Sequence, residues 1–205
     1  MPSRNVVKVY APQSYYHVYA RGASKQKIFL DASDYHYFYK LLQRYLSAEP
    51  EVSKTGKVYP HFKNRITLLA FCLMTNHFHL LVYQEEAEDL QGFMKSVMTS
   101  YSRYFNLRYK RSGPVFESRY KAVRIDSDQY LHHISRYIHL NPRRWENYTN
   151  SSLKFYTQSN TAPAWLDTNP ILSMFSSAEE YHTFMADYEA MRDMLAEIKH
   201  QLADK

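Results

Sequence analysis

The stretch at residues 66–83 reads ITLLAFCLMTNHFHLLVY. Residues 66–73 form an apolar run of strand length, Thr75 and Asn76 suit a turn, and residues 77–83 again favour a strand, so the stretch predicts a β-hairpin. Side chains alternate along a strand, which directs His77 and His79 to the same side. Two histidines arranged in this way need only one or two further ligands to form a metal site.

Strand and helix patterns flank this hairpin. Residues 15–21 and 119–125 have strand patterns, the second typical of an exposed edge. Helical spacing covers residues 34–47, capped by Asp31 or Ser33, residues 90–107, and residues 129–141, which follow a candidate cap at residues 126–128 and stop before Pro142. The order of the first six elements predicts an α+β, ferredoxin-like βαββαβ fold, with an antiparallel sheet backed by two helices. The second face of the sheet is then free for a ligand and for the added helix at 129–141.

We expect one main domain at residues 1–145 and a C-terminal extension at residues 146–205. The first part of the extension is rich in Asn, Ser and Thr, and a capping box at residues 177–180 then opens an amphipathic helix. Its apolar residues are Tyr181, Phe184, Tyr188, Met191, Leu195, Ile198 and Leu202. This helix either packs back on the domain or forms a dimer contact.

The composition indicates a nucleic-acid partner. The chain has 26 Lys and Arg against 20 Asp and Glu, together with 20 Tyr and 11 Phe. Cations neutralise phosphates and aromatic rings stack on unpaired bases, although many basic proteins bind nothing acidic. The single cysteine, Cys72, excludes an internal disulfide framework and a Cys-rich zinc module. We see no signal peptide and no apolar run of the roughly 18 residues that span a membrane, so we expect a cytoplasmic protein without a membrane partner.

Tyr137 and Asn141 are four residues apart and therefore share one face of the predicted helix 129–141. If this helix covers the sheet face that carries His77 and His79, the Asn141 amide oxygen can complete a site for a hard divalent ion. A tyrosine beside a metal on a basic surface suggests nucleophilic attack on phosphorus, with the metal neutralising charge on the phosphate. The resulting link between tyrosine and DNA keeps the bond energy needed to rejoin the strand.

Three motifs resemble those of a known family. His77-Phe78-His79 resembles the HUH motif of single-strand DNA transposases and relaxases. The fuller pattern MTNHFHLL (74–81), GPVF (113–116) and YIHLNP (137–142) resembles the REP-associated tyrosine transposases over about residues 13–145. The resemblance implies Tyr137 as the catalytic nucleophile of a DNA nicking and joining enzyme. It also implies a magnesium or manganese ion on His77, His79 and Asn141.

The same resemblance implies single-stranded DNA with a hairpin as the substrate, cut through a 5′-phosphotyrosine intermediate in DNA transposition. The protein would be a monomer or a homodimer. The alternative is a catalytically inactive nucleic-acid-binding or regulatory module on the same fold. Metal-dependent oxidation, a third hypothesis, would need a carboxylate ligand that neither the strand nor the helix supplies.

Other polar residues have less specific interpretations. We predict phosphate contacts, against an ordinary solvated face, for Arg119, Lys121, Arg124, Arg143 and Arg144. Tyr120 and Tyr130 are the rivals of Tyr137, and we interpret both as packing or base-stacking groups. Near Tyr137, we expect contacts with solvent or DNA for His132, His133 and His139.

Overall fold

The structure is a computed structural model that describes residues 10–125, 128–158 and 161–187. Its centre is a four-stranded antiparallel sheet with the order β2-β3-β1-β4. The strands are β1 (Ser14–Arg21), β2 (Ile66–Met74), β3 (His77–Gln84) and β4 (Lys121–Ile125). This order and the two helices between the strands confirm the predicted ferredoxin-like α+β fold.

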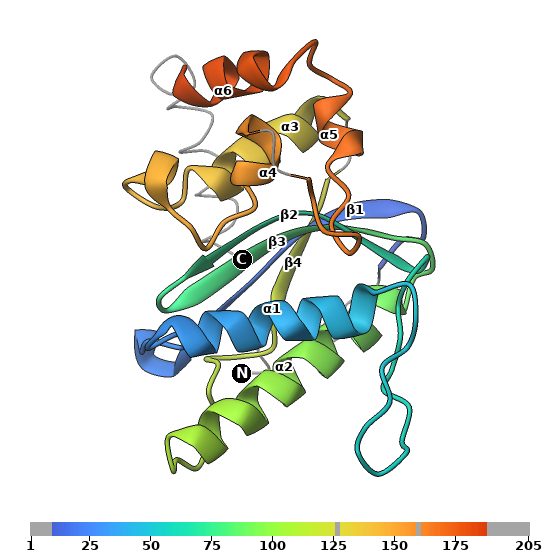
Figure 1. The fold of residues 1–205 in the computed structure, drawn as a ribbon, viewed down its shortest axis with the longest axis vertical. Helices are drawn as coiled ribbons and strands as arrows, with labels where there is room; N and C mark the ends of the chain where they lie inside the picture. Colours follow the sequence, from blue (N-terminus) through green and yellow to red (C-terminus); the bar gives the residue numbers. More distant parts are fainter. Residues whose placement is uncertain (1–9, 126–127, 159–160, 188–205) are drawn as a thin grey trace, which may run out of the picture.

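Helices α1 (Ala32–Leu46) and α2 (Asp89–Arg108) cover one face of the sheet (Figure 1). Of the two predicted caps of α1, Asp31 is the one that accepts from backbone N–H groups, those of Ser33 and Asp34. Phe78 of β3 points to this face, where it is fully buried against Phe38 of α1. Because strand side chains alternate, its neighbours His77 and His79 point to the opposite face.

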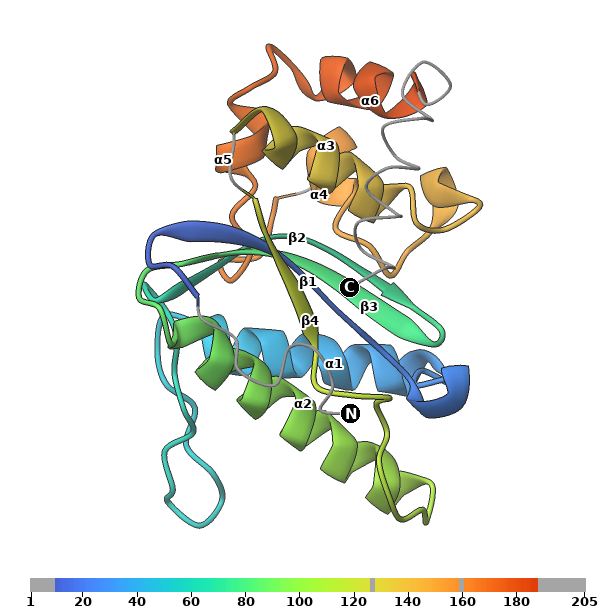
Figure 2. The same ribbon diagram turned by 180° about the vertical axis from the view of Figure 1, so that it is seen from behind.

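The opposite face is covered by α3 (Asp128–His139) and by the described part of the C-terminal extension, as Figure 2 shows from behind. The extension contains a 3-10 turn at Trp145–Asn147 and the helices α4 (Lys154–Thr157), α5 (Asn169–Leu172) and α6 (Ala178–Ala186). Another 3-10 turn, Ala23–Lys25, follows β1. Among the described residues, no helix is long and apolar enough to cross a membrane.

The described part of the extension packs on the domain, which agrees with the first of the two interpretations of the predicted helix. Ser177 caps α6 by accepting from the Glu180 N–H, as the capping box predicts. Tyr181 of α6 is fully buried and shares an apolar cluster with Leu69 of β2 and Ile138 of α3. The predicted helical residues Tyr188, Met191, Leu195, Ile198 and Leu202 and the predicted cap at 126–127 lie outside the described residues.

Candidate active site

His77 and His79 of β3 lie side by side with β1 residues. The antiparallel register pairs His77 with Arg21 and His79 with Tyr19, so all four side chains share the face covered by α3. The imidazole of His79 is 5% exposed and the ring of His77 stands perpendicular to it. The hairpin predicted from the sequence therefore forms, and it brings the two histidines to one side of the sheet.

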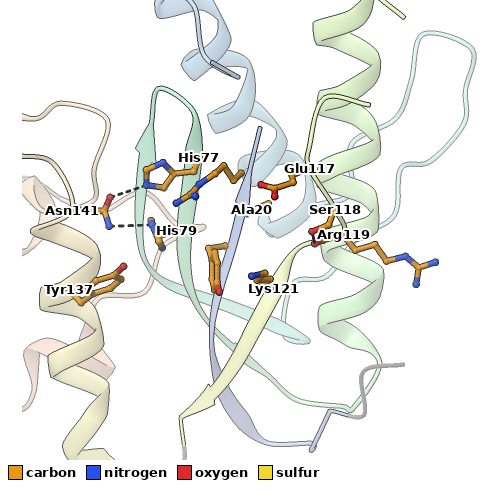
Figure 3. A pocket seen from close by; sticks show the side chains of 11 residues that line it. Ala20, His77, His79, Glu117, Ser118, Arg119, Lys121, Tyr137 and Asn141 are labelled. Carbon is orange, nitrogen blue, oxygen red and sulfur yellow. Dashed lines mark hydrogen bonds between the residues drawn. The ribbon is translucent and has the colours of Figure 1, made fainter. Parts of the chain in front are cut away.

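The Asn141 side chain bridges the two histidines (Figure 3). Its Oδ1 lies 3.0 Å from Nε2 of His77, and its Nδ2 lies 3.2 Å from Nε2 of His79. The sequence predicted that α3 continues to residue 141, but the helix ends at His139. Pro142 disfavours helical geometry at the residue before it, which releases Asn141 from the helix and lets its amide reach the histidines.

Tyr137 is placed on α3, next to the histidine pair. Its ring is perpendicular to that of His79, with 5.7 Å between the centroids, and its side chain is 9% exposed. Burial raises the pKa of the Tyr137 phenol, while Asn141 and the charge of Arg21 act in the opposite direction. The phenol is therefore protonated at neutral pH.

Both histidines are electrically neutral at pH 7. Burial lowers the pKa of His77, and it lowers the pKa of His79 still more, with smaller contributions from His17, His77 and Arg21. Neutral imidazole is the form that binds a metal. His77 Nδ1 lies 2.6 Å from Asn76 Oδ1 and Nε2 lies 3.0 Å from Asn141 Oδ1, so the one N–H of the neutral ring donates to one of these two oxygens. With the N–H at Nδ1, toward Asn76, Nε2 is available to a metal. Two imidazole nitrogens and an amide oxygen that converge in this way fit a divalent cation.

No group of three or more His, Cys, Asp or Glu side chains suited to a metal occurs in the described part of the chain. Within that part, the third ligand that the site offers is the amide of Asn141. Metal-dependent oxidation would require a carboxylate beside the two histidines, and the described residues contain no such cluster of three metal-binding side chains.

A cavity of about 710 Å³ opens in front of the histidines. Its walls consist of Tyr19, Ala20, Arg21, His77, His79, Glu117, Ser118, Arg119, Lys121, Tyr137 and Asn141 (Figure 3). The cavity thus brings together the predicted nucleophile, the three predicted metal ligands and two of the five predicted phosphate contacts. Tyr137 and the histidines that it faces belong to the same chain.

The other three basic residues lie outside this cavity. Arg124 of β4 follows Lys121 by three residues. Because side chains alternate along a strand, an odd separation directs the Arg124 side chain to the opposite face of the sheet. Arg143 and Arg144 are exposed just beyond Pro142 but do not line the cavity.

The rival tyrosines also lie outside the cavity. Tyr120 is 7% exposed and hydrogen-bonded to the Tyr10 hydroxyl, which agrees with a packing role. Tyr130 is half exposed at 51%. Neither side chain lines the cavity that Tyr137 faces.

The prediction that His139 contacts solvent or DNA is wrong. His139 is fully buried, with Nδ1 2.8 Å from the Tyr181 hydroxyl and Nε2 2.7 Å from Ser152 Oγ. The C-terminal extension covers this side of α3, which the sequence pattern of α3 alone does not reveal. His132 and His133 lie against the ring of Phe184 in α6.

Three residues of β1 were missed by the sequence analysis. His17, Tyr19 and Arg21 alternate along the strand in the same way as His77 and His79, and Tyr19 and Arg21 line the cavity. The period-two argument applied to residues 77–79 would have identified them on one face of residues 15–21. Glu117 and Ser118 precede β4 in a segment without a strand or helix pattern, so no such signal was available for them.

Comparison with known proteins matches the central part of the chain to a known family. Residues 57–141, which include the hairpin, α3 and all four candidate site residues, match the family described as "Transposase IS200 like". Residues 57–141 therefore match an IS200-like transposase domain, which supports the HUH tyrosine transposase family predicted from the three motifs. No curated protein sequence matches the chain significantly.

Solved structures share the fold. One described as "Structure of the REP associates tyrosine transposase bound to a REP hairpin" is 11% identical, with a TM-score of 0.55, and the alignment covers 85% of this chain and 96% of that chain. A second, of a Deinococcus radiodurans R1 protein described as a candidate transposase, is 15% identical with a TM-score of 0.38 and covers 67% and 95% of the two chains. The first of these supports the ferredoxin-like arrangement.

Proposed function

We propose that this transposase is a metal-dependent single-stranded DNA endonuclease and strand-transferase that acts beside DNA hairpins through a 5′-phosphotyrosine intermediate. One observation carries the proposal. The Asn141 amide lies within 3.2 Å of the Nε2 atoms of both His77 and His79, and the Tyr137 ring packs against His79 at the same cavity. A candidate nucleophile, Tyr137, and three candidate metal ligands thus line the same cavity.

His77, His79 and Asn141 would hold a magnesium or manganese ion through two imidazole nitrogens and one amide oxygen. Such an ion neutralises charge on phosphate oxygens and polarises the phosphorus toward a nucleophile. Waters and phosphate oxygens from the substrate would complete its coordination, because Mg²⁺ retains several oxygen ligands in addition to those of the protein.

Tyr137 supplies the nucleophile. Its hydroxyl oxygen forms a bond to phosphorus, the bond from phosphorus to the 3′ oxygen breaks, and the phenol proton is lost as the departing 3′ oxygen gains one. The 5′ end of the cut DNA is then a phosphodiester on Tyr137, which a 3′ hydroxyl can attack in the reverse sense. Burial raises the pKa of the phenol and therefore disfavours the phenolate. The positive charge of Arg21 acts in the opposite direction and would stabilise the phenolate that develops during attack.

The cavity wall suits a single DNA strand. Arg21, Arg119 and Lys121 line the cavity and can neutralise phosphates, and Tyr19 offers an aromatic ring for stacking. The hairpin as substrate is supported by the shared fold with a REP-associated transposase whose structure is described as bound to a REP hairpin.

The experiment is adduct formation on hairpin-containing single-stranded DNA with Mn²⁺. We expect a 3′-end label to remain on the protein in a denaturing gel and a 5′-end label to be released, because the 5′-phosphate of the cut becomes attached to Tyr137. Tyr137→Phe should lose the adduct and Tyr130→Phe should keep it. Tight binding without an adduct on the hairpin sequences that flank the gene would instead support the inactive binding module.

A further inference from the structure

His17 lies behind the candidate metal site. It is on β1, fully buried, and does not line the cavity. Its Nε2 is 2.8 Å from Nδ1 of His79, and the two imidazole rings are nearly coplanar, with centroids 5.0 Å apart and an interplanar angle of 11°. His17 therefore contacts the side of His79 that faces away from the cavity.

The hydrogen bond between the two rings bears on which nitrogen of His79 carries the proton. Nε2 of His79 faces the Asn141 amide, so Nε2 is the nitrogen available to a metal. A neutral imidazole that offers a lone pair at Nε2 has its one N–H at Nδ1. That N–H needs an acceptor, and the structure gives it Nε2 of His17.

We propose that His17 is a positioning residue that accepts the Nδ1–H of His79 and so holds His79 in the tautomer and ring plane that a metal requires. Metal-bound histidines generally have such a partner for their second ring nitrogen. The inference rests on the proposed function, since it concerns the same metal site. His17 acts through His79 and is not in contact with the space where substrate would lie.

The hydrogen-bonding of His17 itself favours this role over simple packing. His17 is fully buried, and a neutral imidazole has one N–H. If Nε2 accepts from His79, that N–H is at Nδ1, which has no hydrogen-bond partner among the described residues. An unpaired buried donor is unfavourable, and a purely packing residue here would be apolar. The polar ring is explained by its bond to His79.

His17 also contacts the nucleophile. The Tyr137 ring stands perpendicular to both imidazoles, with centroids 5.6 Å from His17 and 5.7 Å from His79. The coplanar pair of imidazoles thus forms one surface against which Tyr137 packs. Loss of the His17 bond would let the His79 ring turn at the point where it supports Tyr137.

The first test is the tautomer of His79 in metal-free, ¹⁵N-labelled protein, read from two-bond ¹H–¹⁵N couplings and assigned by comparison with His79→Gln. We expect the Nδ1–H form in the wild type and a shift toward the Nε2–H form in His17→Phe, which keeps the ring and removes both nitrogens. An Nε2–H tautomer in the wild-type protein overturns the proposal without reference to any variant.

The second test is Mn²⁺ affinity, measured by electron paramagnetic resonance. Removal of such a partner weakens metal binding by about 10–100-fold, which we expect for His17→Phe. His17→Gln should bind nearly as tightly as the wild type because its Oε1 can accept the Nδ1–H. His61→Phe is the matched control, since His61 bonds to the Ser47 carbonyl and does not line the cavity.

Thermal unfolding of each variant separates positioning from folding. A folded His17→Phe protein with the wild-type Mn²⁺ affinity and the wild-type His79 tautomer overturns the proposal, and if that variant does not fold, His17→Leu is judged by the same criteria. A wild-type protein that binds no Mn²⁺ would refute the proposed metal site, while the tautomer of His79 would still decide the role of His17.

Discussion

Tyr181 of α6 takes part in a chain of buried hydrogen bonds that fixes α3, the helix that carries Tyr137. Ser135 Oγ donates its hydrogen to the His132 carbonyl at 2.8 Å, so it must accept from the Tyr181 hydroxyl, 3.0 Å away. The Tyr181 oxygen in turn accepts Nδ1–H of His139 at 2.8 Å. Nε2 of His139 then accepts from the Ser152 hydroxyl at 2.7 Å, which is nearer to that hydroxyl than its other acceptor, the Phe71 carbonyl at 3.2 Å. These bonds connect α6 to α3, and His139 lies two residues after Tyr137.

Tyr181→Phe should lower the free energy of unfolding by about 2–4 kcal/mol. The change leaves Nδ1–H of fully buried His139 without its acceptor, which costs about 1–3 kcal/mol, and it removes the bond to Ser135, worth about 1 kcal/mol. The ring itself stays in the core. A chain of this length loses roughly 2–4 °C of Tm per kcal/mol, so the expected decrease is about 4–16 °C.

Urea unfolding followed by circular dichroism measures this loss. Tyr83→Phe is the matched control, because the Tyr83 hydroxyl bonds to the side chain of Glu85, both residues are partly exposed, and its removal should change stability by less than about 0.5 kcal/mol. A double variant, His139→Leu with Tyr181→Phe, should show a coupling energy above about 0.5 kcal/mol. If Tyr181→Phe is as stable as Tyr83→Phe, the chain of hydrogen bonds does not hold α3 in the way argued.

Three further perturbations test other parts of the molecule. Asn141→Leu removes the amide between the histidines and should weaken Mn²⁺ binding at least about tenfold in a titration. An unchanged Mn²⁺ affinity would show that Asn141 is not a ligand. Arg119→Ala and Lys121→Ala should each reduce the slope of log Kd for single-stranded DNA against log salt by about 0.7, whereas Arg124→Ala, whose side chain points to the other face, should have a smaller effect. Burial lowers the pKa of His139 to about 3, below its usual 6.5, so the unfolded chain takes up this proton first and stability falls as the pH drops below 6.5. Between pH 6 and pH 5 the decrease in unfolding free energy should be about 1.2 kcal/mol greater in the wild type than in His139→Gln, and equal slopes in urea titrations would refute the assignment.

The sheet and the two helices on its first face could be predicted because each has a strong local pattern. β3 was predicted at residues 77–83 and forms at His77–Gln84, and the helix predicted at 90–107 forms at Asp89–Arg108. Strand alternation and helical spacing are properties of neighbouring residues, so they are visible in one sequence. The short helices α4 and α5 have four residues each, fewer than a periodic pattern needs to be recognised.

The site could be predicted in part for the same reason. His77, His79, Tyr137 and Asn141 belong to two short motifs, and the structure brings these four side chains to one cavity. His17 was missed because its role depends on the pairing of β1 with β3, which joins residues 62 positions apart. The burial of His139 likewise depends on a contact with α6, 42 residues further along the chain. Long-range contacts of this kind leave no periodic signal.

Burial has opposite consequences for the proposed metal ligands and for the proposed nucleophile of this site. It lowers the pKa of His77 and His79, which keeps both imidazoles neutral and available to a cation, but it raises the pKa of Tyr137, which keeps the phenol protonated. A protonated phenol is a weak nucleophile. The same enclosed face therefore prepares the ligands and restrains the tyrosine, so that positive charge near its oxygen is needed for attack. Arg21, which lines the cavity and lowers the Tyr137 pKa, is the residue of β1 that meets this need, and it should affect the rate of adduct formation more than the affinity for DNA.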